Sequence, residues 1–304
     1  MGGRPKLSYE SAQVSREQFS HLFAALAAAS PPKPDSIKEE VVQITPERYV
    51  KIYTPAQASG QLPVGLYVHS GGWYAGAVEF EDGLCRDIVQ RSNIILFSPE
   101  YGLAPENPFP DGLNDVCKAY EWMHENASKY GGDPTRKAVM GGSAGANLSA
   151  CVAVKYASDH ALRPSAILLG AMASCDPRAL PDEYRRRLTP EKYKDLPMIS
   201  TQDMITAREW LNAPPDDPLH SCLLHPSVKL LPQTYIAACT NDPTYQETMF
   251  FYEECKKHGV VVEVKEFVGW PHFFWGIPTL AATEVFQSVW CQKLNEMLET
   301  AAAS

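Results

Sequence analysis

Short apolar runs alternate with helix-length segments along most of the chain. The runs lie at about residues 40–54, 64–69, 93–98, 137–141, 165–171, 234–239 and 260–267. Strands that alternate with helices in this way form a mainly parallel sheet with helices on both faces. Only a short turn separates the two strands expected between Val41 and Tyr53, so this first pair should be antiparallel. The pattern therefore predicts an α/β fold.

An N-terminal helix is predicted before the first strand. Its apolar residues recur at helical spacing: Phe19, Leu22, Phe23 and Leu26. Ser15 should cap this helix, with Gln18 closing a capping box. Three prolines between Ser30 and Pro34 should end it.

One stretch, at about 174–231, interrupts the alternation of strands and helices. It is polar, punctuated by prolines and helix-prone, with no convincing strand. The N-terminal helix, within about 1–38, also has no place inside an alternating β/α core. We therefore expect a single domain, 1–304, on which these two segments form a helical cap. Caps of this kind shape binding pockets.

Composition narrows the classes of function. Hydrophobic residues make up 45% of the chain and charged residues 21%, and no window reaches the roughly 18 apolar residues of a membrane span. The net charge of −9 argues against nucleic acid as a partner, because nucleic-acid binding requires a basic face. The chain begins without an apolar run of signal-peptide length, and its eight cysteines lack paired spacing, which suits free thiols in a reducing compartment. These features predict a cytoplasmic protein.

The strongest chemical signal is a Gly-x-Ser-x-Gly motif, Gly141 to Gly145, between an apolar strand and a helix pattern. A serine on a sharp strand-to-helix turn has a strained backbone, and flanking glycines let the strand and the helix cross closely. The serine hydroxyl then stands exposed at the start of the helix. Ser143 is therefore the candidate nucleophile, although a glycine-rich turn without any chemistry has the same local sequence.

A second glycine turn follows the strand that ends near residue 69. It reads HSGGW, from His69 to Trp73. Ester hydrolysis passes through a tetrahedral oxyanion, which backbone amides stabilise where no side chain blocks their approach. Gly71 and Gly72 meet this requirement, and the amide of Ala144, directly after the serine, would supply a third donor.

A serine hydroxyl needs a base near neutral pH. Folds that carry the serine on a strand-to-helix turn supply the base in the chain order serine, acid, histidine. Five histidines follow Ser143, and only His272 comes after a strand-like run, Val260 to Val268, that itself follows an acid at a strand end. That acid is Asp242. Because the carboxyl ends of parallel strands meet at one edge of a sheet, we expect the three side chains to converge there.

Four blocks of sequence resemble the hormone-sensitive-lipase family of α/β-hydrolase carboxylesterases. They are HSGGW (69–73), YGLAPENPFPDGLNDV (101–116), GGDPTRKAVMGGSAGANLSA (131–150) and NDPTYQE through HGVVVEVKEFVGWPHFF (241–274). The resemblance covers nearly everything after residue 60. It implies an α/β-hydrolase fold and places the nucleophile, acid, base and oxyanion donors at the six positions that the chemistry selects.

Several positions depart from the pattern of that family. Ser70 stands where a glycine is usual, and Gly142 replaces the usual acid before the nucleophile. Glu100 and Gly102 replace an aspartate and an arginine, so a supporting ion pair should be missing. Phe273 replaces the glycine that usually follows the histidine, and its bulky ring should occupy or wall the pocket.

Aromatic residues near the expected site indicate an aromatic-lined pocket. The candidate substrate-binding residues are Trp73, Tyr74, Phe273 and Phe274. For each of these rings, ordinary core packing explains the residue equally well.

The sequence therefore predicts a serine carboxylesterase that hydrolyses small-molecule esters through an acyl-enzyme, without a metal or an organic cofactor. His220 and His225 have ligand-type side chains, but their spacing fits no zinc signature. By resemblance, the acyl group should be short, acetyl in particular, and a secondary metabolite would supply the alcohol part. The apolar pattern from about Glu284 to Leu298 fits a helix on the sheet or a helix that pairs two subunits, so a homodimer stays open.

Three alternative functions also stay open. An amidase or arylformamidase would use the same triad but must protonate a poorer leaving amine. A dehydratase or cyclase would use these residues as acid and base without acylation. A non-catalytic small-molecule receptor of this fold would lack the histidine, whereas His272 is present.

Overall fold

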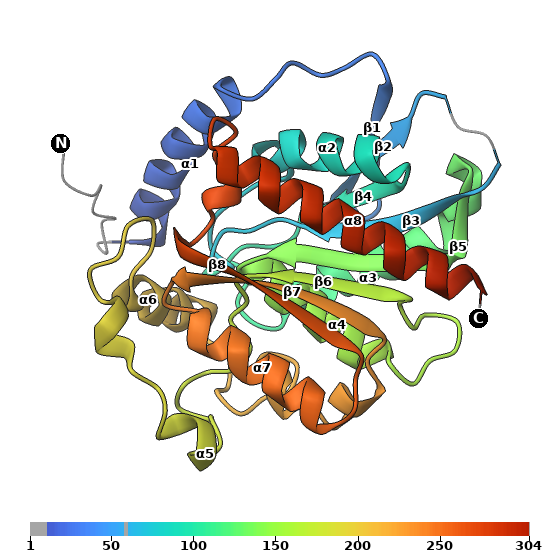
Figure 1. The fold of residues 1–304 in the computed structure, drawn as a ribbon. Coiled ribbons are helices and arrows are strands. Elements are labelled where there is room, and N and C mark those ends of the chain that lie inside the picture. The colour runs from blue at the N-terminus through green and yellow to red at the C-terminus, as the bar shows by residue number, and fades with distance from the viewer. Residues whose placement is uncertain (1–10, 58–59, 304) are drawn as a thin grey trace.

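A mixed sheet forms the centre of the structure. The computed structural model describes residues 11–57 and 60–303, and the strands within them form one eight-stranded sheet (Figure 1). The strands are β1 (Ile37–Gln43), β2 (Tyr49–Pro55), β3 (Leu62–Val68), β4 (Ile95–Pro99), β5 (Gly132–Gly142), β6 (Ala166–Gly170), β7 (Gln233–Asn241) and β8 (Val262–Pro271). Their order across the sheet is β1-β2-β4-β3-β5-β6-β7-β8.

The strand pairing confirms the expected topology. β1 pairs antiparallel with β2, and β2 pairs antiparallel with β4. All further neighbours, from β4 through β8, are parallel. The parallel strands therefore end at one common edge, which is where sheets of this type carry their binding sites.

Helices cover both faces of the sheet. They are α1 (Ala12–Ala28), α2 (Asp82–Ser92), α3 (Asp111–Asn126), α4 (Ala144–Tyr156), α5 (Asp182–Arg185), α6 (Thr201–Leu211), α7 (Tyr245–Lys257) and α8 (Ala281–Ala303). Figure 1 shows α2 and α8 on one face of the sheet, and α3, α4 and α7 on the other. The expected α/β architecture is confirmed.

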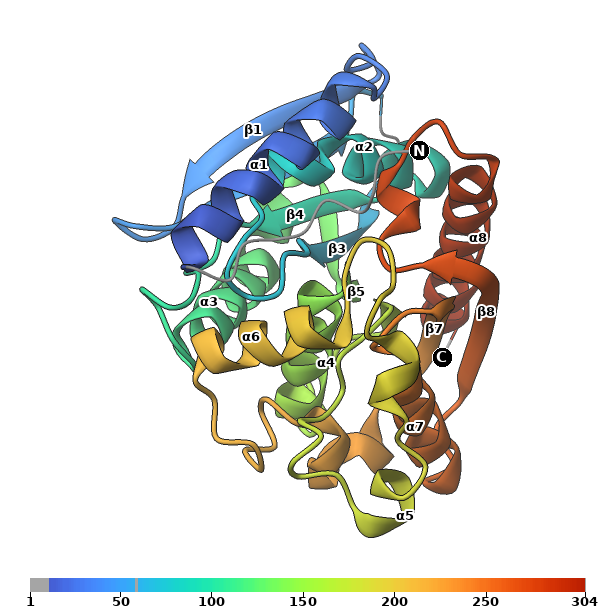
Figure 2. The ribbon, with the colours of Figure 1, turned by 90° about the vertical axis from the view of Figure 1, so that its left-hand side faces the viewer.

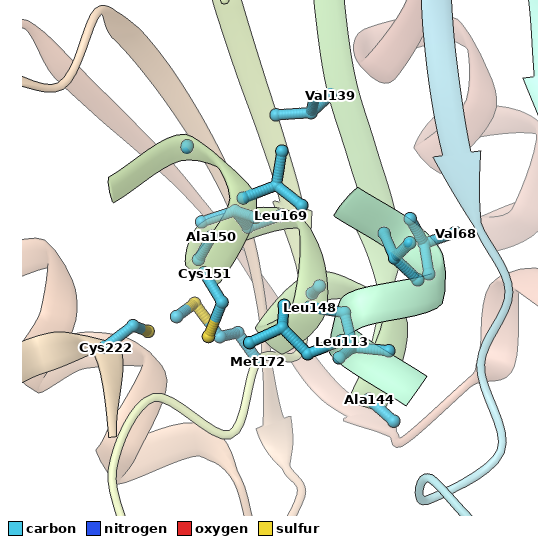
Figure 3. Close-up of a cluster of buried hydrophobic side chains, with 14 of the residues drawn as sticks. Val68, Leu113, Val139, Ala144, Leu148, Ala150, Cys151, Leu169, Met172 and Cys222 are labelled. Carbon is cyan, nitrogen blue, oxygen red and sulfur yellow. The ribbon is translucent and has the colours of Figure 1, made fainter. Parts of the chain in front are cut away.

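Alternate residues of each strand enter two separate cores, because successive side chains of a strand point to opposite faces. Val139 and Leu169 belong to the core beneath α4, where Leu148 joins them (Figure 3). Their chain neighbours Met140 and Leu168 belong to the core beneath α2 and α8. Fully buried strands of this kind appear in the sequence as continuous apolar runs.

Helix α8 packs its apolar face onto the sheet. Phe286, Trp290 and Leu294 are buried in the core on that side. This packing accounts for the apolar pattern of the helix without a second subunit, and a homodimer stays a prediction. Although α8 has 23 residues, no helix in the described part of the chain combines the length and apolarity needed to cross a membrane.

The N-terminal helix begins earlier than expected. It starts at Ala12, so the prediction that Ser15 caps it is wrong. The hydroxyl of Ser11 instead accepts a hydrogen bond from the amide of Val14 at 3.2 Å, which is the contact of an N-cap. Ser15 lies one turn inside the helix, because its amide donates to the carbonyl of Ser11 at 3.1 Å. The Ser15–Gln18 spacing fits a capping box, whereas Ser11 has Val14 at the same spacing, so only the backbone bonding shows that the helix starts one turn earlier.

Helices α1 and α6 lie at the end of the sheet toward which the parallel strands point (Figure 2). Every residue of 174–231 is described, and this stretch contains α5, α6 and three short 3₁₀ turns but no strand. Ser200 and Asp203 form a capping box at the start of α6: the Ser200 amide donates to the Asp203 carboxylate at 2.6 Å, and the Asp203 amide donates to the Ser200 hydroxyl at 3.4 Å.

A buried ion pair ties α6 to α7. Nη2 of Arg208 lies 2.8 Å from both carboxylate oxygens of Glu247, and both side chains are buried. Burial raises the pKa of Glu247, and the positive charge of Arg208 opposes this effect. The loss of one partner would leave the other charge buried without compensation.

Arg208→Ala should therefore lower the free energy of unfolding by about 3–5 kcal/mol. Urea unfolding followed by tryptophan fluorescence measures the loss. Arg185→Ala is the control, because the side chains of the Arg185–Asp182 pair are 55% and 71% exposed and such pairs contribute about 0–1 kcal/mol. Equal losses in the two variants would contradict the role of the buried pair.

Candidate active site

Ser143 lies on the sharp turn between β5 and α4. Its φ of 55° and ψ of −123° are strained for a residue that has a side chain. Its amide donates to the carbonyl of Gly170 in β6 at 2.8 Å, which fixes the turn to the sheet.

Two glycines make this turn possible. A Cβ atom on Gly145 would overlap the carbonyl oxygen of Val68 at the end of β3, and a Cβ atom on Gly141 would lie 2.6 Å from the same oxygen. Only residues without a side chain let α4 begin this close to β3. The motif therefore places Ser143 next to the loop that follows β3.

His272 and Asp242 reach Ser143 from the ends of two further strands. Asp242 directly follows β7, and His272 directly follows β8. Nε2 of His272 lies 2.8 Å from Oγ of Ser143, and Nδ1 of His272 lies 2.7 Å from Oδ2 of Asp242. The structure thus brings the three predicted residues into one hydrogen-bonded chain.

Asp242 is fixed from a second side. Its other carboxylate oxygen accepts hydrogen bonds from the amide and the hydroxyl of Thr244, at 2.7 and 2.8 Å. A fully buried carboxylate held in this way favours the His272 tautomer with its proton on Nδ1, so that Nε2 can accept the serine proton. Sequence reasoning missed Thr244, whose only signal is its position at the start of α7.

Gly71 and Gly72 form a tight loop beside Ser143. Their φ angles of 130° and 61° are positive, which favours glycine. The amide of Ala75 donates to the carbonyl of Gly71 at 2.9 Å, and a Cβ atom on Gly71 would overlap the carbonyl oxygen of Ala75. Ala144 opens α4, and amides in the first turn of a helix have no helical acceptor. Gly71 and Gly72 line the same pocket as Ser143, and Ala144 directly follows the serine, so the role of the three amides as oxyanion donors stays a prediction.

A mainly apolar pocket of about 390 Å³ opens at Ser143. Two of the four candidate binding residues, Tyr74 and Phe273, line it. The rest of its apolar wall, which sequence reasoning did not identify, consists of Phe19, Leu22, Phe23, Met198, Ile199, Met204 and Ala207. The first three belong to the apolar face of α1, which was visible in the sequence without any indication of what it covers.

Trp73 and Phe274 do not line this pocket. Nε1 of Trp73 donates to Oδ1 of Asn147 at 3.2 Å. This bond joins the loop of Gly71 and Gly72 to α4. Phe274 is fully buried and packs against Phe267. These two rings are core residues, the alternative that the sequence had left open.

The two histidines considered as metal ligands have other roles. His220 packs edge-on against Trp73, and burial lowers the pKa of His220 to about 4. Nδ1 of His225 accepts a hydrogen bond from the amide of Ser227 at 3.1 Å. Within the described residues, no group of three or more His, Cys, Asp or Glu side chains is placed to hold a metal ion.

Comparison with known proteins identifies the family. A family model described as alpha/beta hydrolase fold matches residues 65–276. Versiconal hemiacetal acetate esterase of Aspergillus parasiticus is 36% identical over 244 residues, which are 80% of this chain and 76% of that protein. The chain belongs to the hormone-sensitive-lipase-like family of α/β-hydrolases.

Solved structures show the same architecture. A vibralactone cyclase superimposes with a TM-score of 0.89 at 26% identity, over 99% of this chain and 92% of that one. A bacterial heroin esterase superimposes with a TM-score of 0.86 at 24% identity, over 97% of this chain and 94% of that one. The second likeness is evidence for the fold alone.

Ser70, where the family usually has glycine, holds the Gly71–Gly72 loop through hydrogen bonds on two sides. Its hydroxyl donates to the carbonyl of Gly142, just before the nucleophile, at 3.1 Å. Its amide donates to Oε1 of Glu81 at 2.7 Å. Glu81 is buried and also accepts a hydrogen bond from the hydroxyl of Tyr67, and burial raises the pKa of Glu81. Sequence reasoning missed Glu81, because no local pattern marks a carboxylate that acts across such a distance in the chain.

Gly142 leaves room for an aromatic ring. A Cβ atom at this position would lie 2.8 Å from Cζ2 of Trp275. The indole, which is buried in the core beneath α2 and α8, therefore occupies the space where the family usually has an acidic side chain.

An ion pair lies beside Gly102, but it uses neither position 100 nor position 102, so the expected loss of the family's pair stays a prediction. Nε of Arg48 lies 2.5 Å from Oδ2 of Asp115, which also accepts the amide of Gly102 at 3.0 Å. A Cβ atom on Gly102 would overlap the guanidinium of Arg48. The guanidinium of Arg48, from the β1–β2 turn, thus occupies the space that a side chain at position 102 would need.

Glu100 contacts residues that come before and after the Gly71–Gly72 loop in the chain. Its carboxylate accepts a hydrogen bond from the amide of Val78 at 3.1 Å and lies 3.9 Å from Nε2 of His69. Burial raises the pKa of Glu100 to about 7, and burial lowers the pKa of His69. Neither residue lines the pocket at Ser143.

Ser70→Ala should lower kcat about fivefold with little change in KM. The lost hydroxyl contributes roughly 1 kcal/mol to holding the Gly71–Gly72 loop against the turn that carries Ser143. Steady-state kinetics on p-nitrophenyl acetate gives both constants. Ser149→Ala is the control, since Ser149 is buried in α4 and its hydroxyl has no hydrogen-bond partner among the described residues. An unchanged kcat in Ser70→Ala would show that this hydroxyl is dispensable.

Proposed function

We propose that this protein is a serine carboxylesterase that hydrolyses short-chain esters through an acyl-enzyme. One observation carries the proposal: the hydrogen-bonded chain from Ser143 through His272 to Asp242 ends beside the Gly71–Gly72 loop in an apolar pocket. An acyl transfer needs a nucleophile, a base and oxyanion donors in this arrangement.

The proposed reaction has two halves. In the first, Oγ of Ser143 attacks the ester carbonyl while Nε2 of His272 takes the serine proton, and the imidazolium then gives that proton to the leaving alcohol. In the second, His272 activates a water that releases the acid from the serine. Asp242 holds the imidazole and stabilises its positive charge, and the amides of Gly71, Gly72 and Ala144 stabilise the oxyanion of both halves.

The substrate in this proposal is an acetyl or similarly short ester of a secondary metabolite. The relative from Aspergillus parasiticus is named for an acetate ester, versiconal hemiacetal acetate. The apolar wall of the pocket, with Tyr74, Phe19 and Met204, suits an aromatic or aliphatic alcohol part.

Two further predictions from the sequence remain part of the proposal. The segments of about 1–38 and 174–231 would act as a cap on a single domain, because α1 and the residues around α6 supply most of the apolar wall of the pocket. The location would be cytoplasmic, since all eight cysteines, each within the described residues, are buried free thiols.

A cyclase is the second candidate, because vibralactone cyclase shares 26% identity and the same fold over 99% of this chain. Hydrolysis of an amide or a formamide would use the same residues, and assays on such substrates would distinguish it from ester hydrolysis. The intact hydrogen bonds of His272 argue against a receptor.

Ser143→Ala should abolish ester hydrolysis, with a loss of about 10⁴-fold or more in kcat, because the reaction requires the serine oxygen. Asp242→Asn should cost about 10⁴-fold by favouring the wrong imidazole tautomer. Assays on p-nitrophenyl acetate measure both losses, and peptide mapping after fluorophosphonate treatment locates the nucleophile.

The control is Ser149→Ala, which should keep both activity and labelling. Substantial turnover in Ser143→Ala would favour acid–base chemistry without acylation, as in the cyclase alternative. Fluorophosphonate labelling at another residue would overturn the assignment of the nucleophile.

A further inference from the structure

Phe273 has a backbone that is unusual for a large residue. It directly follows His272, and its φ of 58° and ψ of 21° lie in the left-handed region. A bulky side chain rarely adopts this conformation, and such strain persists where the surrounding structure holds the residue in place.

The surroundings of Phe273 are built around its ring. A Cβ atom on Gly276 would overlap that ring, so only glycine at 276 leaves the necessary space. The ring packs edge-on against Phe23 of α1 at a centroid distance of 5.2 Å, and Trp275 lies at 5.3 Å. Phe273 is 5% exposed, so it is fixed between α1 and the turn that carries the histidine.

Phe273 also stands between two cavities. It lines the pocket of about 390 Å³ at Ser143, and it lines a second cavity of about 330 Å³ that does not include Ser143. Phe23 lines only the first cavity and Phe80 lines only the second, and these two rings stack at 5.3 Å with an interplanar angle of 5°. The three phenylalanines therefore form a continuous aromatic partition.

The partition begins at Phe273, the residue directly after the general base His272. The leaving oxygen must come within reach of Nε2 of His272 to receive its proton, while the carbonyl oxygen faces the amides of Gly71 and Gly72. An alcohol part that extends past the imidazole would meet Phe273, which lines the same pocket as Ser143 and His272.

We propose that Phe273 is the specificity-determining residue that limits the size of the alcohol part of the substrate by closing the catalytic pocket against the second cavity. This inference rests on the proposed esterase function. Without the ring, the two cavities join, and larger alcohols gain a preformed space lined by Leu84, Arg86 and Gln287.

The test compares the wild type with Phe273→Gly. Glycine is chosen because it accepts the left-handed backbone without strain. Two acetate esters differ only in their alcohol, ethanol or 2-naphthylmethanol. The ratio of kcat/KM for the naphthylmethyl ester to that for the ethyl ester should rise about tenfold or more in the variant, as expected when a pocket wall is removed. Phe273→Leu should give a smaller rise.

Two further variants separate the partition from a general enlargement. In Phe273→Gly/Gly276→Leu the new side chain refills the vacated space, so the ratio should return toward the wild-type value. Gln287→Ala enlarges the second cavity and leaves the partition intact, because Gln287 lines only that cavity, and it should not reproduce the rise. Thermal unfolding of each variant confirms that it is folded.

Each outcome has one meaning for the proposal. An unchanged ratio in folded, active Phe273→Gly, or an equal rise in Gln287→Ala, overturns the inference and leaves the esterase function intact. A gain confined to longer p-nitrophenyl acyl esters overturns it as well, since Phe273 would then wall the acyl side. A wild-type enzyme that cleaves no ester would instead refute the proposed function itself.

Discussion

The close approach of helix α4 to strand β3 is the constraint on which the site depends. Gly145 has no space for a side chain against the carbonyl of Val68, and Gly141 has little more. This contact forces Ser143 into its strained turn and also places it beside the loop of Gly71 and Gly72, which continues from β3. Two backbones that nearly touch thus set Ser143 and the Gly71–Gly72 loop in register, and the hydroxyl of Ser70 adds one side-chain contact between them.

A second constraint is the close packing around three glycines near the site. At Gly142, Gly102 and Gly276 the missing side chain leaves a space that another residue fills: Trp275, Arg48 and Phe273, respectively. In the first two cases the filling residue comes from a distant part of the sequence. Close packing requires that such spaces be occupied, so a departure from the family pattern at a glycine is compensated by a side chain elsewhere.

The sequence predicted the features that local patterns encode. Apolar runs predicted the strands, and the serine motif with the chain order serine, acid, histidine predicted the residues that the structure brings together at Ser143. It failed where a contact joins residues far apart. Arg48 fills the space beside Gly102, which lies 54 positions further along the chain, and Glu81 holds Ser70 through a buried hydrogen bond, so neither residue had a local signal. Ser15 with Gln18 fitted a capping box, yet the helix bonding begins one turn earlier, at Ser11.

Chemistry and selectivity come from different parts of this fold. The ends of β5, β7 and β8 hold Ser143, Asp242 and His272, and a parallel sheet fixes their separation through its backbone hydrogen bonds. The shape of the pocket depends instead on α1 and the residues around α6, which lie outside the sheet (Figure 2). Phe273 connects the two parts, because it follows the histidine in the chain and packs against Phe23 of α1. A substitution in α1 can therefore change which esters fit without altering the distance between His272 and Ser143. A substitution at position 273 instead acts where the pocket wall meets the catalytic residues.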